Sequence, residues 1–390
     1  ESVLITGLGG ALGLALAWIG IDLVVALAPA DLPRLDAVEL DASVVGVAVL
    51  VAGLMALVAG IVPALLTLRV DVARILKDGD GRSGGSARTT RTRDALVAAQ
   101  VALSLMLLVG AGLTASAFSA LLEEDPGFDA ESALTFTVPV SEIDYPTPED
   151  QAAFHEGILT RFSSLPGVRV AGATTALPLT AVTNQRGVGF PDSPTNTGID
   201  ADDGLLVDWF RATPGYFEAA GFRLLEGRSF DRVDSDTTTF NVIIDDVLAR
   251  RFYPDGGALG ARVAFLNDTA TVVGVVDQAR LYSVYEDDRG QVFVPFRLLP
   301  NERMSFVLRT EVDPVGLVAG ARAIVNEADP SVPVSDVRTL EGIVGDSLGE
   351  QRLSLTLILA FAFGAVLLAA LGLYGVVSNT VTSRSREIAV

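Results

Sequence analysis

The sequence predicts an α-helical transmembrane protein with a large α+β extracytoplasmic domain. Four hydrophobic stretches lack charged residues, and a long acidic segment separates the last two of them. The stretches span residues 3–21, 44–68, 96–122 and 353–377. At about 1.5 Å rise per residue, each can cross a hydrocarbon core of roughly 30 Å. Buried helices of soluble proteins are rarely so long and so apolar on every side, so we interpret all four as membrane helices.

The positions of the cations predict the orientation. Seven cations lie between the second and third stretches: Arg69, Arg74, Lys77, Arg82, Arg88, Arg91 and Arg93. Arg384 and Arg386 follow the fourth stretch, whereas the loop 29–43 is mainly acidic. Cytoplasmic loops are enriched in Lys and Arg. We therefore expect the seven-cation loop and the C-terminal end inside the cell, and residues 123–352 outside.

This topology divides the chain into six segments. They are two transmembrane helices in 1–68, a basic cytoplasmic linker in 69–95, a transmembrane helix in 96–122, the extracytoplasmic domain in 123–352, a transmembrane helix in 353–378, and the start of a cytoplasmic segment in 379–390. The chain begins at Glu1 and stops at Val390 within an arginine-rich segment, which indicates an internal piece of a longer protein.

Composition argues against several functions. Residues 123–352 contain 37 Asp and Glu against 18 Arg, so nearly the whole formal charge of −20 lies there and nucleic acid is a poor partner. Without cysteine the chain has neither disulfides nor thiolate metal sites. Its single lysine, Lys77, is followed by Asp78, so no phosphate-binding GxxxxGK[ST] loop is present. The chain is not expected to hydrolyse ATP itself.

The extracytoplasmic domain shows a β-α-β pattern twice. Strands are expected at 133–138 and 168–175 around a helix at 147–164, and again at 304–309 and 332–337 around a helix at 313–328. Two such halves predict a ferredoxin-like subdomain. Between them, residues 178–300 predict a β-rich lobe. Its expected elements are strands at 242–244, 270–276 and 291–295, a short helix at 245–252, and a long mobile loop at 181–204.

Neither a catalytic, a cofactor nor a metal site emerges from the residue pattern. His155, the only histidine, is expected to lie on the surface of its helix, without a nucleophile motif nearby. The acidic pairs lack the ligand spacing of a calcium loop and are interpreted as solvated faces. These pairs are Glu123-Glu124, Asp202-Asp203, Asp245-Asp246 and Asp287-Asp288.

The hydrophobic stretches suggest helix packing rather than solute passage. Gly9 and Gly13 form a GxxxG pair, and Ala365 and Ala369 form a similar pair of small residues, which lets helices approach closely in lipid. Asp22 and Gln100 lie near the ends of their stretches, so neither indicates a polar route through the membrane. Such a chain suits the transmission of motion better than the conduction of a substrate.

Several motifs resemble those of FtsX-like, MacB-type ABC permeases. The run from Ser383 to Ala389 is similar to their RxREI segment. Pro178 and the runs 214–217, 227–230 and 272–276 resemble signature positions of the MacB-type periplasmic core domain. The linker and the run 95–108 are similar to the duplicated orphan permeases, in which two FtsX-like units are fused.

This resemblance implies a permease without enzymatic activity of its own. It implies a separate ABC ATPase subunit that binds ATP-Mg, a homodimer or pseudo-dimer of FtsX-like units, an extracytoplasmic partner protein, and a place in the bacterial inner membrane. It also implies that Arg384, Arg386, Glu387 and Ile388 contribute to coupling with the ATPase. The main alternative is a membrane-anchored binding or sensor protein without a transport cycle. A cell-surface hydrolase is a third class, disfavoured by the scarcity of histidine and cysteine.

Overall fold

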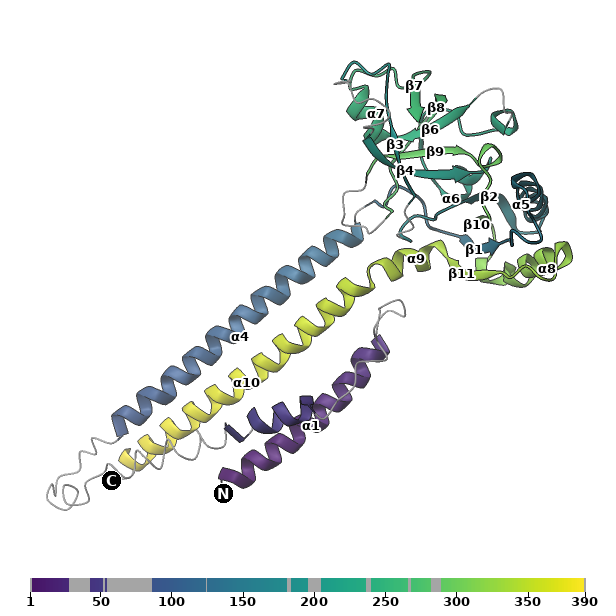
Figure 1. Cartoon of the computed structure of the whole chain (residues 1–390). Helices are drawn as coiled ribbons and strands as arrows, with labels where there is room; N and C mark the ends of the chain where they lie inside the picture. Colours follow the sequence, from purple (N-terminus) through teal and green to yellow (C-terminus); the bar gives the residue numbers. More distant parts are fainter. Residues whose placement is uncertain are drawn as a thin grey trace. The chain divides into compact units, whose positions relative to one another are not determined.

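The computed structural model describes residues 2–27, 43–51, 53–54, 86–123, 125–180, 184–195, 205–235, 240–265, 268–281 and 289–388. The chain divides into two compact units (Figure 1). We call Glu1–Ala120 with Gly349–Val390 the helical unit, and Leu121–Leu348 the sheet unit.

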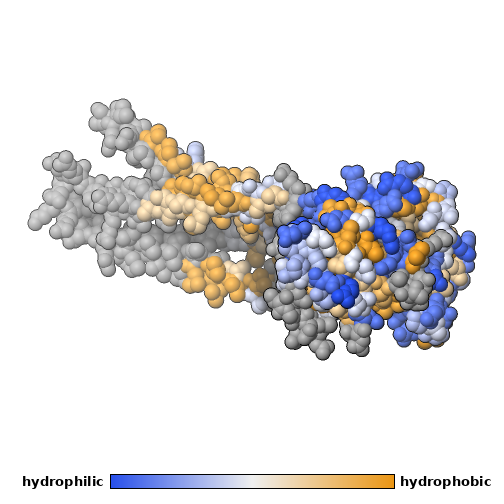
Figure 2. Space-filling model, turned by 90° about the horizontal axis from the view of Figure 1, so that it is seen from above, coloured by the Kyte–Doolittle hydropathy of each residue, from blue (hydrophilic) through white to orange (hydrophobic). Residues whose placement is uncertain are grey.

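Three long helices form most of the described helical unit: α1 (Ser2–Leu27), α4 (Ser86–Glu123) and α10 (Gly349–Ile388). Two helical segments among the described residues are long and apolar enough to cross a membrane, Val97–Ala120 of α4 and Gln351–Gly375 of α10. The apolar part of α1 is shorter, at Gly7–Asp22. Figure 2 shows that hydrophobic residues predominate where these helices are drawn in colour. Most of the predicted stretch 44–68 lies outside the described residues.

Both long helices extend beyond their apolar parts. α4 begins at Ser86, inside the predicted linker, and α10 continues to Ile388 through the arginine-rich run. An α-helix satisfies its backbone hydrogen bonds internally, so it can continue from an apolar into a polar environment without a break. The sequence-based boundaries followed hydrophobicity, which does not mark the ends of such helices.

The sheet unit contains one 11-stranded mixed sheet with the order β11-β1-β10-β2-β4-β9-β6-β8-β5, in which β3 also pairs with β4 and β7 with β8. The strands are β1 (Ala133–Pro139), β2 (Val168–Thr174), β3 (Gln185–Val188), β4 (Leu205–Ala212), β5 (Leu224–Gly227), β6 (Asn241–Asp245), β7 (Arg262–Phe265), β8 (Asp268–Val276), β9 (Gln291–Pro295), β10 (Arg303–Thr310) and β11 (Ser335–Thr339). The helices are α5 (Pro148–Ser163), α6 (Tyr216–Ala220), α7 (Asp246–Phe252), α8 (Val318–Ala328) and α9 (Leu340–Ser347).

The ferredoxin-like half is present as predicted. Its strands follow the order β11-β1-β10-β2 with every neighbour antiparallel, and α5 and α8 connect them as two split β-α-β units (Figure 1). The Thr147 hydroxyl accepts from the Asp150 amide at 3.1 Å and caps α5, with Pro148 in its first turn. In its core, Phe136 stacks on Phe306, and Phe162 packs edge-to-face against both rings.

The last strand of this half begins at Ser335, three residues later than expected. Pro333 has no N–H to donate to a strand ladder, and Val332 instead packs into the core as part of the preceding turn. The helix at 313–328 is divided as well. It begins with the 3₁₀ turn η5 (Pro314–Leu317), in which the Asp313 carboxylate accepts from the Val315 amide at 3.1 Å.

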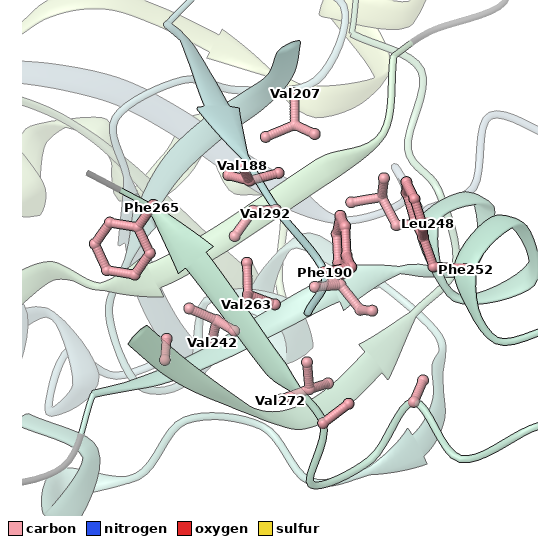
Figure 3. Close-up of a cluster of buried hydrophobic side chains, with 14 of the residues drawn as sticks. Val188, Phe190, Val207, Val242, Leu248, Phe252, Val263, Phe265, Val272 and Val292 are labelled. Carbon is pink, nitrogen blue, oxygen red and sulfur yellow. The ribbon is translucent and has the colours of Figure 1, made fainter. Parts of the chain in front are cut away.

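The β-rich half continues the same sheet through a single pairing of Thr174 with Ala212. Strands β6, β8 and β9 and helix α7 confirm the sequence prediction, but β3, β4, β5 and β7 were missed. Strand β3 lies inside the region 181–204 that was predicted as a mobile loop, so that prediction was wrong for residues 185–188; residues 181–183 and 196–204 lie outside the described residues. Figure 3 shows the apolar core that this half builds from β-branched and aromatic residues, including Val188, Val242 and Phe252.

Candidate functional site

Small residues lie where α4 and α10 contact each other. The Ser104 hydroxyl donates to the Ala365 carbonyl at 2.8 Å and to the Gln100 carbonyl, also at 2.8 Å. Ala111 and Ala362 are each 2% exposed. A methyl group on Gly372 would lie 2.7 Å from the Gln100 side-chain oxygen. The two helices therefore approach closely, in the manner typical of small residues in lipid.

The contact follows a repeat of three and four residues along α10. Its partly or fully buried positions include Leu355, Ile358, Ala362, Ala365, Ala369 and Gly372, while Leu359, Phe361 and Leu368 are exposed. This spacing is the one with which two helices pack along their length. Ala365 and Ala369, predicted from sequence as packing residues, both lie on this stripe, whereas the described residues leave open space around Gly9 and Gly13.

Replacing Gly372 with leucine should separate α4 from α10, because the new side chain meets Gln100. Since the chain lacks cysteine, cysteines placed at Ser104 and Ala365 would report the contact by their disulfide yield. We expect a several-fold lower yield with Gly372→Leu. Gly364→Leu is the matched control, because nothing lies within 4 Å of a methyl group there. Equal yields in the two variants would contradict this arrangement.

The predicted coupling residues Arg384, Arg386, Glu387 and Ile388 form the last turns of α10. Their side chains lie outside the part that the structure describes. The structure shows only that these residues are helical. Their role in coupling stays a prediction.

Residues 125–132, which connect α4 to β1, are held against the sheet unit over their whole length. We call them the α4–β1 connection. Phe128 forms a β-bridge with Phe222, the Asp129 amide donates to the Gly221 carbonyl at 3.0 Å, and the Arg280 amide donates to the Pro126 carbonyl at 3.0 Å. Gly127 has φ +85° and approaches the Gln278 carbonyl so closely that no side chain would fit.

Arg309 on β10 provides the polar part of this attachment. Its side chain is only 5% exposed. It donates to the Asp129 carboxylate at 2.9 Å, to the Glu131 carbonyl at 2.7 Å and to the Ala219 carbonyl at 3.0 Å. A buried guanidinium is stable only when its donors are matched in this way. Arg309 thus links the α4–β1 connection to α6 and to the centre of the ferredoxin-like half.

The chain leaves the sheet unit beside the strand on which it entered. Strand β11, which precedes α9 and α10, pairs with β1. The Thr339 hydroxyl accepts from the Gly342 amide at 3.0 Å and caps α9, whose Leu340 and Ile343 are buried. Both connections to the long helices therefore belong to neighbouring strands at one edge of the sheet.

A family model decides which known proteins this chain resembles. The model of the MacB-like periplasmic core domain matches residues 42–337, more than half of the chain. The chain belongs to this family.

The chain is also similar to individual proteins. The macrolide export ATP-binding/permease protein MacB of Acinetobacter baylyi is 25% identical over 183 residues, which cover 45% of this chain and 27% of the relative. The chain thus spans about a quarter of that relative's length. The periplasmic region of MacB from Actinobacillus actinomycetemcomitans has a TM-score of 0.38 at 13% identity and covers 57% of this chain and 95% of that structure. The extracellular domain of the noncanonic ABC-type transporter YknZ from Gram-positive bacteria gives 0.35 at 13% identity, covering 52% and 100%.

The motifs of the MacB-like core have structural causes in this chain. In the run 214–217, Gly215 has φ +83° and starts α6, which places the buried Tyr216 and Phe217 against the sheet. A methyl group on Gly172 of β2 would lie 2.3 Å from the Tyr216 Cα atom, so glycine allows α6 to lie on this strand. In the run 227–230, Arg228 pairs with the buried Asp234.

His155 is buried in the MacB-like core, so the expectation of a surface position was wrong. The residue is 1% exposed and lies among Phe154, Phe296 and Phe306, with Nε2 3.2 Å from the Val138 carbonyl oxygen. Burial lowers the pKa of His155 to about 4. His155 lies on the side of α5 that faces the sheet. The sequence did not reveal this, because a single polar residue among apolar ones does not show which side of the helix is buried.

The pair Asp245-Asp246 is likewise buried rather than a solvated face. Asp245 caps α7 by accepting from the Leu248 amide at 2.9 Å, and it also accepts from the Gln291 amide at 3.0 Å. Burial raises the pKa of the Asp245 carboxyl to about 8. The other three acidic pairs lie wholly or in their side chains outside the described residues, and the described part contains no cluster of three metal-ligating side chains.

Proposed function

We propose that this chain is the permease part of an ABC-type export or mechanotransmission system. ATP hydrolysis by a separate nucleotide-binding subunit would move α4 and α10, and these helices would move the MacB-like core. The observation that carries this proposal is the attachment of both helical connections to neighbouring strands β1 and β11 at one edge of the sheet. Movement of a whole domain is one of the ways in which proteins transmit a change between distant sites.

The described helices also support transmission over conduction. The α4–α10 contact is made by small residues and a few hydroxyl or amide groups, and the described apolar segments contain no chain of ionisable residues of the kind that transport paths use. ATP-Mg belongs to the partner subunit in this proposal. A homodimer or a pseudo-dimer of FtsX-like units, and an extracytoplasmic partner protein, complete the assembly that the family membership suggests.

Orientation is tested by cysteine labelling in whole cells. We expect Ser86→Cys to be shielded from a membrane-impermeant thiol reagent, because the cation-rich region before α4 belongs inside. Ser235→Cys should be labelled, because the MacB-like core belongs outside, in the space beyond the bacterial inner membrane. Lysed cells, in which both sites are reachable, provide the control. Labelling of Ser86→Cys in intact cells would overturn the orientation.

Coupling is tested at the end of α10 in the full-length protein together with its ATPase. Glu387→Ala should lower the stimulation of ATP hydrolysis while membrane insertion stays normal, since loss of a charge-assisted hydrogen bond typically costs about 1.5–3 kcal/mol. If Arg384 and Arg386 only anchor the helix at anionic lipid, at about 1 kcal/mol each, the acid is not needed. Ser383→Ala is the control on the same helical turn. Unchanged stimulation by Glu387→Ala at normal abundance would leave only the anchoring role for Arg384 and Arg386.

A further inference from the structure

Among the residues that the structure describes, two half-buried arginines of the β-rich half have no acidic partner, whereas nine other arginines of the sheet unit have one. A carboxylate lies within 4 Å of Arg161, Arg223, Arg228, Arg250, Arg262, Arg297, Arg303, Arg309 and Arg338. Among the residues that the structure describes, no carboxylate lies this close to Arg186 or Arg211, and the Nε atom of each is buried without a hydrogen-bond acceptor. Arg169, Arg251 and Arg322 also have no carboxylate within 4 Å in the described part of the chain, but these three are exposed.

The strand register places both arginines on one face of the sheet. Arg186 of β3 lies opposite Val207 of β4. Residues separated by two along a strand share a face, so Val207, Trp209 and Arg211 point to the same side as Arg186. The acid on this strand, Asp208, lies between Val207 and Trp209. Its position directs its side chain to the other face of the sheet. Arg186 and Arg211 therefore lie on the same face as the apolar core, and the described part of β4 places no acidic residue on that face.

Burial and the positive charge of Arg186 both lower the pKa of Arg211. Arg186 lies opposite Val207, four residues before Arg211 on β4. Placing two partly desolvated cations together is unfavourable unless an anion accompanies them.

Trp209 adds a third unmatched donor between them. It follows the Arg186–Val207 pair on β4 and precedes Arg211 by two residues on the same face. Its side chain is 0% exposed, it packs against Phe265, and its indole Nε1 has no hydrogen-bond acceptor among the described residues. Indole and guanidinium groups can only donate hydrogen bonds. All three side chains can pair only with an acceptor, and the two guanidinium groups also favour one that bears negative charge.

We propose that Arg186, Trp209 and Arg211 form a binding site for an oxyanion, the phosphate or carboxylate group of a ligand. Guanidinium groups bind either group through paired hydrogen bonds. The site lies on the core face of strands β3 and β4 and shares no residue with the α4–β1 connection. It is independent of the proposed transport function, since a binding or sensor protein could equally use it.

The fluorescence of Trp209 tests this site in the full chain. The protein has two tryptophans, so Trp18→Phe leaves Trp209 as the only one. Inorganic phosphate and succinate, each titrated into the detergent-solubilised protein at constant ionic strength with chloride as the exchanged ion, should give a saturable change in fluorescence. The anion with the lower midpoint identifies the preferred group.

Charge-removing variants establish the role of each arginine. Arg186→Gln and Arg211→Gln should each raise the midpoint at least about tenfold, while Arg303→Gln, which alters an exposed arginine on β10, should leave it unchanged. Arg186→Lys and Arg211→Lys keep the charge but lose the paired geometry, so they should weaken binding even if a glutamine variant fails to fold. The proposal is overturned if neither anion gives a saturable change, or if all arginine variants in the site bind as tightly as the parent.

Discussion

Arg309→Met is expected to lower the free energy of unfolding of the sheet unit by about 1–3 kcal/mol, the usual cost of leaving buried hydrogen-bond acceptors without their donor. The variant leaves the Asp129 carboxylate and three carbonyl groups without their shared donor. Methionine fills part of the space of the arginine stem, so the loss comes mainly from these polar groups. Trp209, fully buried in this unit, reports unfolding by its fluorescence during a urea titration in the Trp18→Phe background.

Arg303→Gln is the matched control for this experiment. Arg303 lies on the same strand and pairs with Asp336, but its side chain is 63% exposed. Exposed ion pairs contribute little to stability, so the urea midpoint should hardly change. A similar decrease in the urea midpoint for both variants would contradict the prediction. It would show that loss of any arginine on β10 destabilises the sheet unit, whether or not it contacts the α4–β1 connection.

The same variant separates a structural from a mechanical role. If the α4–β1 connection transmits force, Arg309→Met should reduce the stimulation of ATP hydrolysis even at a temperature where Trp209 fluorescence shows the sheet unit folded. Normal stimulation in a folded Arg309→Met protein would limit Arg309 to stability.

The ferredoxin-like half was predictable because its signals are local. Thr147 and Pro148 specify the start of α5, and the β-branched run at 133–138 specifies β1. The β-rich half was harder to predict. Strand β5 is four residues long and exposed throughout, so it lacks both the length and the alternation that reveal a strand. Strand β4 is buried on both faces from Val207 to Phe210 and includes Asp208 and Trp209, which hides its period.

The candidate sites depend on contacts that sequence cannot supply. Ala365 was identifiable as a small residue, but its partner Ser104 is 261 residues away in the chain. The attachment by Arg309 joins β10 to residues 178 and 180 positions earlier. An arginine in a strand of an acidic domain gives no indication of its burial until the strand order is known. For the same reason Arg186 and Arg211 were indistinguishable from surface arginines.

Lowering the pH from 7 to about 4 should destabilise the wild-type sheet unit relative to His155→Leu by about 3 kcal/mol. The pKa of His155 is about 4 when folded, against an ordinary value of 6.5. Above pH 6.5 the imidazole is neutral in both states and has no effect on the pH dependence. Between pH 6.5 and 4 only the unfolded chain binds the proton, so the folded state loses stability as the pH falls, by about 1.4 kcal/mol for each unit of pKa difference.

The comparison with His155→Leu isolates this effect from other titrating groups. Asp245, whose pKa rises to about 8 on burial, acts in the opposite sense: the folded state keeps a proton that the unfolded chain releases above pH 4, so acidification favours folding. Asp245 is present in both proteins and cancels in their difference. Leucine cannot titrate and suits a site lined by Phe296 and Phe306. The difference in unfolding free energy between the two proteins, measured from urea titrations at pH 7, 5.5 and 4.5, should therefore shift steadily toward the variant. A difference that stays constant with pH would mean that His155 takes up its proton in the folded state as readily as in the unfolded chain.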